Sequence, residues 1–139
     1  MISIQKIIKK IGKIKNLTQM LEYNAKINKN KIFLVYENYS ITFGQTYDLV
    51  NNCCNYLLSK NLKRQNIVSI VLKNSIEFVI VYFACIKLNL RLNPLPYYLS
   101  PNSIKMSISF LKPKLVVTDY FMSEKIGGKF YYIRFENFE

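Results

Sequence analysis

Residues 67–95 read IVSIVLKNSIEFVIVYFACIKLNLRLNPL and contain the pattern of a strand, a helix and a second strand. The first six residues, Ile67 to Leu72, are almost all apolar and mostly β-branched, which is typical of a strand buried on both faces of a parallel sheet. Residues 76–88 form a nearly unbroken apolar run, too long for a strand, and so predict a helix. Residues 91–95 begin a second short strand. The whole segment therefore predicts one βαβ unit.

The expected helix of this unit is preceded by Lys73, Asn74 and Ser75, which break the apolar run with residues that often cap helices. Glu77 stands three places after Asn74, the spacing of a capping box. This spacing favours a capping role for Glu77 over the role of a catalytic base.

Helices and strands alternate along the rest of the chain. Thr42 and Gln45 have the spacing of a capping box, and Ser100-Pro101 places proline at a favoured first helical position. Residues 37–39 are expected to form a turn. Such alternation predicts an α/β layered domain with a mostly parallel sheet flanked by helices. The further expected elements are helices at 17–28, 42–60, 100–112 and 121–125, and strands at 31–36, 115–118 and 130–133.

The composition is that of a globular protein. Of the 139 residues, 50% are hydrophobic and 20% are charged, which suits one domain with its own core. The net charge of +12 comes mostly from scattered lysines among many Asn, Ile and Tyr residues, a bias that AT-rich codons produce. No nucleic-acid-binding module accompanies the charge, so we expect no nucleic-acid partner.

The three cysteines, Cys53, Cys54 and Cys85, all lie within apolar helical patterns. An odd number without metal-ligand spacing argues against a disulfide framework or a zinc site, and the chain has no histidine. Buried, reduced thiols are expected, and with them a cytoplasmic protein.

The first sixteen residues, MISIQKIIKKIGKIKN, form a basic amphipathic segment with isoleucines on one helical face. Such a helix can lie on an anionic membrane surface, but it can also pack on its own domain or fray at the terminus. We favour the latter two over membrane binding because the segment has no Trp or Phe anchor. It lacks the features of a secretory signal, and no segment reaches the eighteen apolar residues of a membrane span. The expected organisation is this segment, 1–16, followed by an α/β domain at 17–139.

A series of short motifs extends over about a hundred residues between Leu17 and Asp119. These motifs are Ser40-Ile41-Thr42-Phe43-Gly44-Gln45, Asn74-Ser75-Ile76-Glu77-Phe78, Tyr82-Phe83-Ala84-Cys85-Ile86-Lys87, Pro94-Leu95, Ser100-Pro101 and Val116-Val117-Thr118-Asp119. In the order and spacing of these motifs, the stretch resembles the amino-terminal part of the AMP-dependent synthetase and ligase family, whose members are acyl-adenylate-forming and acyl-CoA synthetase-like enzymes.

The resemblance implies the fold of the first subdomain of an adenylate-forming enzyme and the role of an N-terminal fragment of an ATP-dependent, carboxylate-activating acid–thiol ligase. In the family, the phosphate loop, the Thr-Glu motif that helps to hold magnesium, the ribose-binding aspartate and the catalytic lysine all come later in the chain. We therefore expect a truncated chain that is inactive alone, with no catalytic, cofactor-binding or metal-binding residue. ATP and magnesium are expected only for the intact enzyme, and the implied partner is a complementary chain.

The chain departs from the family at four positions. Asn61 stands where the family usually has glycine after the second helix, Gln65 and Asn66 where it usually has a Gly-Asp pair, and Asn89 where it usually has another glycine. Asparagine tolerates the left-handed conformation better than most residues, so Asn61 and Asn89 are expected to keep the fold, with Gln65 a poorer substitute.

Two further positions are expected to have structural roles. Gly127-Gly128-Lys129 is the nearest match to a phosphate loop, but it lacks the hydroxyl residues and the strand–loop–helix setting, which favours a tight turn. Asp119 is expected to end a strand.

The alternative function is a non-catalytic interaction module that retains the fold and binds a partner protein or a membrane surface.

Overall fold

A computed structural model of the protein describes residue 12, residues 14–128 and residues 132–134. The predicted amphipathic helix at residues 1–16 falls almost entirely outside the described residues. The chain divides into two compact units, Met1–Leu49 and Val50–Glu139, and the division falls within helix α3 (Phe43–Ser59). Each unit is described by itself.

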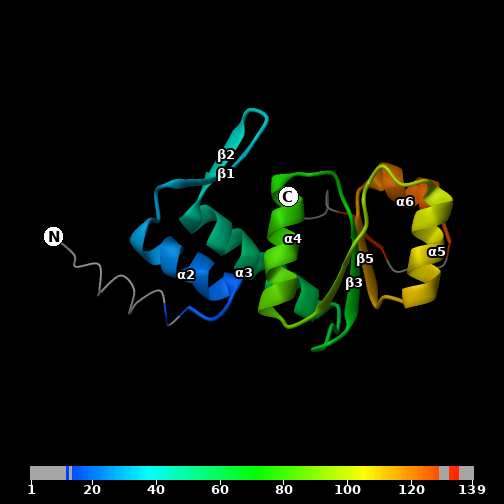
Figure 1. Cartoon of the computed structure of the whole chain (residues 1–139), viewed down its shortest axis with the longest axis horizontal. Helices are drawn as coiled ribbons and strands as arrows, with labels where there is room; N and C mark the ends of the chain where they lie inside the picture. Colours follow the sequence, from blue (N-terminus) through cyan, green and yellow to red (C-terminus); the bar gives the residue numbers. More distant parts are fainter. Residues whose placement is uncertain (1–11, 13, 129–131, 135–139) are drawn as a thin grey trace. The chain divides into compact units, whose positions relative to one another are not determined.

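The first unit contains helix α2 (Leu17–Ile27), strands β1 (Ile32–Tyr36) and β2 (Tyr39–Thr42), and the first turns of α3. The two strands pair antiparallel as a hairpin, with Tyr36 opposite Tyr39 (Figure 1). The predicted α2 and β1 are confirmed. The prediction of a turn over residues 37–39 is wrong in part, because Tyr39 already belongs to β2.

The capping box predicted at the start of α3 is confirmed. The Gln45 N–H donates to Thr42 Oγ1 at 3.2 Å, and the Thr42 N–H donates to Gln45 Oε1 at 2.9 Å. Beside this cap, the rings of Phe33 and Phe43 stack with centroids 4.4 Å apart, which fixes the hairpin against the start of the helix.

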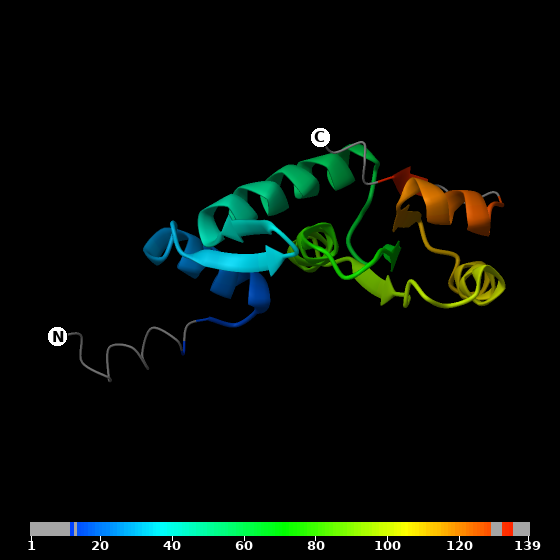
Figure 2. The same cartoon turned by 90° about the horizontal axis from the view of Figure 1, so that it is seen from above.

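The second unit is built on a parallel sheet, as the βαβ pattern predicts, and the order of its strands is β4-β3-β5-β6. Helix α4 covers one face of this sheet, and α5 and α6 cover the other (Figures 1 and 2). The chain runs from β3 to β4 on one side and then crosses back to β5 on the other. The elements are β3 (Ile67–Val71), α4 (Ile76–Lys87), β4 (Arg91–Pro94), α5 (Pro101–Leu111), β5 (Leu115–Thr118), α6 (Tyr120–Ile126) and β6 (Tyr132–Arg134).

The core of this unit lies on both faces of the central strands. All residues of β5 and all but the first of β3 are buried, which explains why their sequences do not alternate. Burial of each such aliphatic side chain contributes about 1.5–3 kcal/mol. The cluster on the face of α5 and α6 consists of Val71, Ile104, Ile108, Val116, Met122 and Ile126.

Helix α4 begins at Ile76, as predicted, but its N-cap lies one residue after the Asn74 of the predicted capping box. Its N-cap is Ser75, whose Oγ accepts a hydrogen bond from the Phe78 N–H at 3.2 Å. Glu77 is consequently the second residue of the helix, one place too early to complete a capping box, and the proposed capping role of Asn74 and Glu77 is wrong. The carboxylate still lies in the first turn, where it interacts favourably with the helix dipole.

The residues that stand where the family has glycine adopt the conformation that glycine favours. The φ angles of Asn61, Gln65 and Asn89 are 57°, 68° and 53°. Gln65 is held there by two contacts: its N–H donates to the Asn89 carbonyl, and its Oε1 accepts from Arg91 Nε, both at 2.9 Å. These contacts offset part of the backbone strain.

Replacing the α4 cap tests its assignment. Ser75→Ala is expected to lower the free energy of unfolding by about 1 kcal/mol, because the Phe78 N–H loses its acceptor. The matched Asn74→Ala variant is expected to change it by less than about 0.5 kcal/mol. Urea unfolding followed by circular dichroism measures both, and a larger loss for Asn74→Ala would contradict the assignment.

Replacing Gln65 tests the backbone strain. Gln65→Gly relieves the strained φ angle, whereas Gln65→Ala keeps it, and both lose the hydrogen bond to Arg91. The glycine variant is therefore expected to be more stable than the alanine variant by about 1 kcal/mol. Equal unfolding midpoints for the two variants would show that the positive φ angle of residue 65 does not destabilise the folded chain.

Candidate functional site

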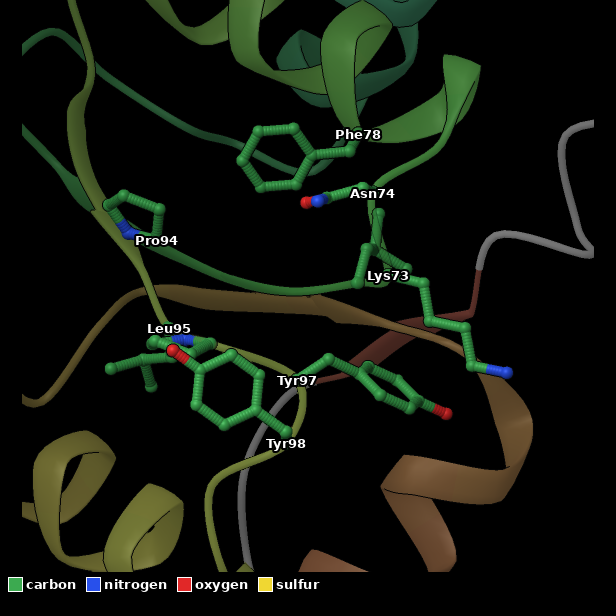
Figure 3. A pocket seen from close by; sticks show the side chains of 9 residues that line it. Lys73, Asn74, Phe78, Pro94, Leu95, Tyr97 and Tyr98 are labelled. Carbon is green, nitrogen blue, oxygen red and sulfur yellow. The ribbon is translucent and has the colours of Figure 1, made fainter. Parts of the chain in front are cut away.

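An open cleft lies at the carboxyl ends of β3 and β4, with a volume of about 560 Å³ (Figure 3). Parallel strands end at the same edge of a sheet, and this edge is where ligands bind in open α/β folds. The cleft is lined by Leu72, Lys73, Asn74, Phe78, Pro94, Leu95, Pro96, Tyr97 and Tyr98.

Two loops that each follow a strand build the cleft. The first connects β3 to the N-cap of α4, and the second connects β4 to α5, whose N-cap Ser100 accepts from the Ser103 N–H at 3.1 Å. The second loop is tied to the sheet because the Leu95 N–H donates to the Ile70 carbonyl at 2.9 Å. Leu95 and Tyr97 pack on the core, while Pro96 and Tyr98 are exposed.

Phe78 and Asn74 lie across the open space from Leu95 and Tyr98, and Lys73 extends along one side (Figure 3). The Lys73 ammonium lies 5.4 Å from the centre of the Tyr97 ring, within the range of a cation–π contact. Lys73 is the single charged residue among the nine that line the cleft.

The chemistry of this lining is suited to binding. None of the nine residues is a carboxylic acid, a thiol or a histidine, so the lining contains no group that exchanges protons near neutral pH. Its aromatic faces, amide and ammonium can orient a ligand without reacting with it. None of the lining residues was singled out as a site from the sequence, although Lys73 and Tyr97 each follow the end of an expected strand.

The three thiols are buried, as predicted. Burial raises the pKa of Cys53 to about 12, and the neighbouring Cys54 adds to this shift. Burial also raises the pKa values of Cys54 and Cys85. The Cys54 thiol lies 3.7 Å from the Ala84 carbonyl, to which it can donate a weak hydrogen bond between α3 and α4. Burial and a raised pKa are the properties of structural cysteines, whereas reactive cysteines are accessible and have a lowered pKa.

The other candidate positions have structural roles. Asp119 is the N-cap of α6, and its Oδ1 accepts from the Met122 N–H at 2.7 Å; it stands just after β5 instead of ending it. Gly127 ends α6 and donates its N–H to the Ser123 carbonyl, so the glycine pair follows a helix, whereas a phosphate loop precedes one. Lys129 lies outside the described residues.

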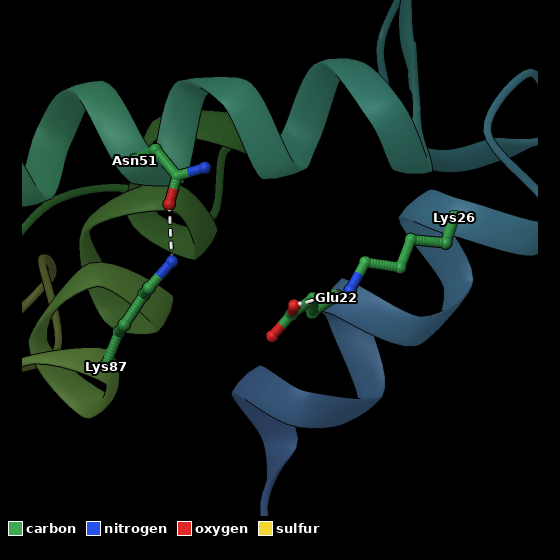
Figure 4. Close-up of polar contacts among 4 residues, drawn as sticks. All are labelled: Glu22, Lys26, Asn51 and Lys87. Atoms are coloured by element: carbon green, nitrogen blue, oxygen red, sulfur yellow. Dashed lines mark hydrogen bonds and ion pairs between the residues drawn. The ribbon is translucent and has the colours of Figure 1, made fainter.

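Two lysines elsewhere form local polar contacts (Figure 4). Lys87 Nζ donates to Asn51 Oδ1, which joins α4 to the second half of α3. Lys26 pairs with Glu22 at 2.8 Å along α2, and this contact raises the pKa of Lys26. Exposed pairs of this kind add little to stability.

Within residues 12, 14–128 and 132–134, no group of three or more Cys, Asp and Glu residues is arranged to hold a metal ion. None of the helices described there has the length and apolar content that a membrane crossing requires.

The sequence profile of the family described as AMP-binding enzyme matches residues 21–131. The chain belongs to the AMP-binding enzyme family. The resemblance noted in the sequence is thereby confirmed.

The relatives that this chain resembles are longer than the chain. The chain is 30% identical over 94 residues to the peroxisomal butyrate–CoA ligase AAE11 of Arabidopsis thaliana, a match that covers 66% of this chain and 16% of that protein. It resembles O-succinylbenzoate coenzyme A synthetase (MenE) of Bacillus subtilis in complex with AMP, with a TM-score of 0.77 and 19% identity, over 85% of this chain and 31% of that chain.

A second solved structure, the N-terminal subdomain of NpsA from Klebsiella oxytoca, gives a TM-score of 0.80 at 17% identity, over 90% of this chain and 32% of that chain. The chain thus spans less than a third of each of these three relatives. At these identities the two structures show the fold, which is that of a part of the N-terminal subdomain of adenylate-forming enzymes.

The thiol assignment predicts slow chemical modification. At pH 8 the folded chain is expected to react with Ellman's reagent roughly 100-fold or more slowly than the chain in guanidinium, where all three thiols react. Rapid modification of one thiol in the folded chain would identify an accessible, ionised cysteine.

The same shift has a consequence for stability. Unfolded thiols ionise near their ordinary pKa of 9.0, whereas folded Cys53 ionises near 12. The unfolded state therefore releases its protons first as the pH rises. The protonated Cys53 thiol therefore contributes to the free energy of unfolding in full below about pH 9, and this contribution is lost as the pH approaches 12.

Proposed function

We propose that this chain forms the opening part of the N-terminal subdomain of an ATP-dependent ligase, which activates a carboxylic acid as its acyl adenylate and transfers the acyl group to a thiol. The match to the AMP-binding enzyme family over residues 21–131 carries this proposal. The names of two relatives support the same chemistry, since one is a butyrate–CoA ligase and the other a coenzyme A synthetase bound to AMP.

Within such a ligase, the chain acts as scaffold. The described residues do not fit ATP and magnesium: they include no cluster of acidic residues for the metal, and Gly127 lies in a helix-ending turn. We therefore assign no catalytic, cofactor-binding or metal-binding residue to this chain and propose that it is inactive alone. A complementary part of the enzyme would supply the phosphate loop and the catalytic lysine.

The proposed location is the cytoplasm. The three buried cysteines, none of which forms a disulfide bond, support this location because the cytoplasm keeps thiols reduced. We propose no nucleic-acid partner, because the positive charge is scattered. Membrane contact through residues 1–16 remains a secondary proposal, weaker than packing of this segment on its own domain.

The second candidate function is a non-catalytic interaction module. It is supported by apolar side chains that the fold leaves uncovered, notably Phe110 on α5, which is 85% exposed, and Tyr39 on the hairpin, which is 71% exposed. Side chains of this type are common in protein interfaces.

Carboxylate-dependent exchange of pyrophosphate into ATP tests the ligase proposal. The purified chain is expected to give no exchange above the protein-free blank with a panel of acids that includes butyrate and o-succinylbenzoate. The Bacillus subtilis synthetase with o-succinylbenzoate serves as the positive control. Clear exchange by the chain alone would contradict the proposed inactivity.

Sequencing the transcript beyond the codon for Glu139 shows whether a complementary part is encoded. If it is, adding that part to the chain is expected to produce exchange with at least one acid. If no such part is encoded, or if the mixture gives no exchange while the control does, the interaction module becomes the better assignment.

A further inference from the structure

The cleft at the carboxyl ends of β3 and β4 presents aromatic surfaces on opposite sides. Phe78 faces the open space from the first turn of α4, and Tyr98 faces it from the loop after β4 (Figure 3). Tyr98 is 88% exposed, so its ring contributes little to the core and is accessible to a ligand. Aromatic side chains on two sides of an open cleft favour a ligand with an apolar or aromatic part.

The charge of the lining has one sign. Lys73 carries the only charge among the nine lining residues, and the nearest acidic residue in the sequence, Glu77, is not one of them. The contact with the Tyr97 ring holds the Lys73 ammonium at the side of the cleft. The net charge of +12 adds to the positive potential. A negatively charged group is therefore favoured beside Lys73.

The cleft also stands at a favourable place in the sheet. It lies at the carboxyl ends of the neighbouring parallel strands β3 and β4, the edge at which open α/β sheets bind ligands. From the shape, the charge and this position, we propose that the cleft binds a small aromatic anion, with its ring between Phe78 and Tyr98 and its charge beside Lys73.

Titration of the full chain with naphthalene-2-sulfonate tests this site. A sulfonate cannot form an acyl adenylate, and no ATP is added, so the result is independent of the ligase proposal. The expected outcome is a saturable shift of the amide resonances of Leu72, Lys73, Asn74, Tyr97 and Tyr98, with a dissociation constant of about 1 mM, as for other fragments of this size. The absence of saturable shifts at these amides would overturn the proposal.

Substitutions at exposed positions separate the two parts of the site. Lys73→Met is expected to weaken binding about threefold through loss of the charge, and Tyr98→Ala about fivefold through loss of the ring. The matched control is Lys60→Met. Lys60 makes the same kind of contact, with its ammonium 4.8 Å from the centre of the Tyr56 ring, but it does not line the cleft. This substitution is therefore expected to leave the affinity unchanged.

Matched ligands complete the test. The uncharged naphthalene-2-sulfonamide and the non-aromatic hexane-1-sulfonate are each expected to bind at least about threefold more weakly than naphthalene-2-sulfonate. Equal binding of the sulfonamide would show that the charge is not recognised. Equal weakening by Lys60→Met and Lys73→Met would show that general charge attraction, and not this cleft, holds the anion. Either result overturns the proposal.

Discussion

The second unit depends on the position of β3, which pairs with β4 along one edge and with β5 along the other. A strand that pairs along both edges and is covered by helices on both faces is shielded from water. Its side chains must therefore be apolar or fully hydrogen-bonded. The few polar groups there meet this condition. Asn93 Nδ2 donates to the buried Ser69 hydroxyl, and the buried Thr118 hydroxyl donates to the Val71 carbonyl, both at 2.9 Å. In the described part of the chain, no buried side-chain nitrogen or oxygen lacks a partner.

This arrangement also explains why the candidate site is a cleft of loop residues. Most residues of β3 and β5 are buried in the core, and seven of the nine lining residues belong to the loops that follow β3 and β4; the other two are Pro94 in β4 and Phe78 in α4. Lys73 and Tyr98 stand just after β3 and β4, where the chain leaves the sheet and turns toward a helix. The same edge that marks the end of the core therefore carries the accessible aromatic and charged groups.

Much of the fold could be predicted from particular residues. The apolar run at 76–88 predicted α4, Ser100-Pro101 predicted the start of α5, and Asn89 was expected where glycine-like geometry occurs. Strand β2 was missed because its four residues run directly into the α3 cap. The α4 cap was misplaced because Asn74 and Ser75 are both good caps, and only the backbone conformation distinguishes them. The cleft could not be predicted because its two loops are separated in sequence and meet only when β3 and β4 pair in parallel.

The order of the strands in space differs from their order along the chain, and this has a consequence for synthesis on the ribosome. Strand β3 is made first among the four, yet it occupies an interior position whose second neighbour, β5, is made only after α4, β4 and α5. Until Leu115–Thr118 has left the exit tunnel, the edge of β3 that later pairs with β5 has no hydrogen-bonding partner. A nascent chain stalled in this interval would expose that edge to other chains, and so would be a natural client of chaperones that bind extended apolar segments.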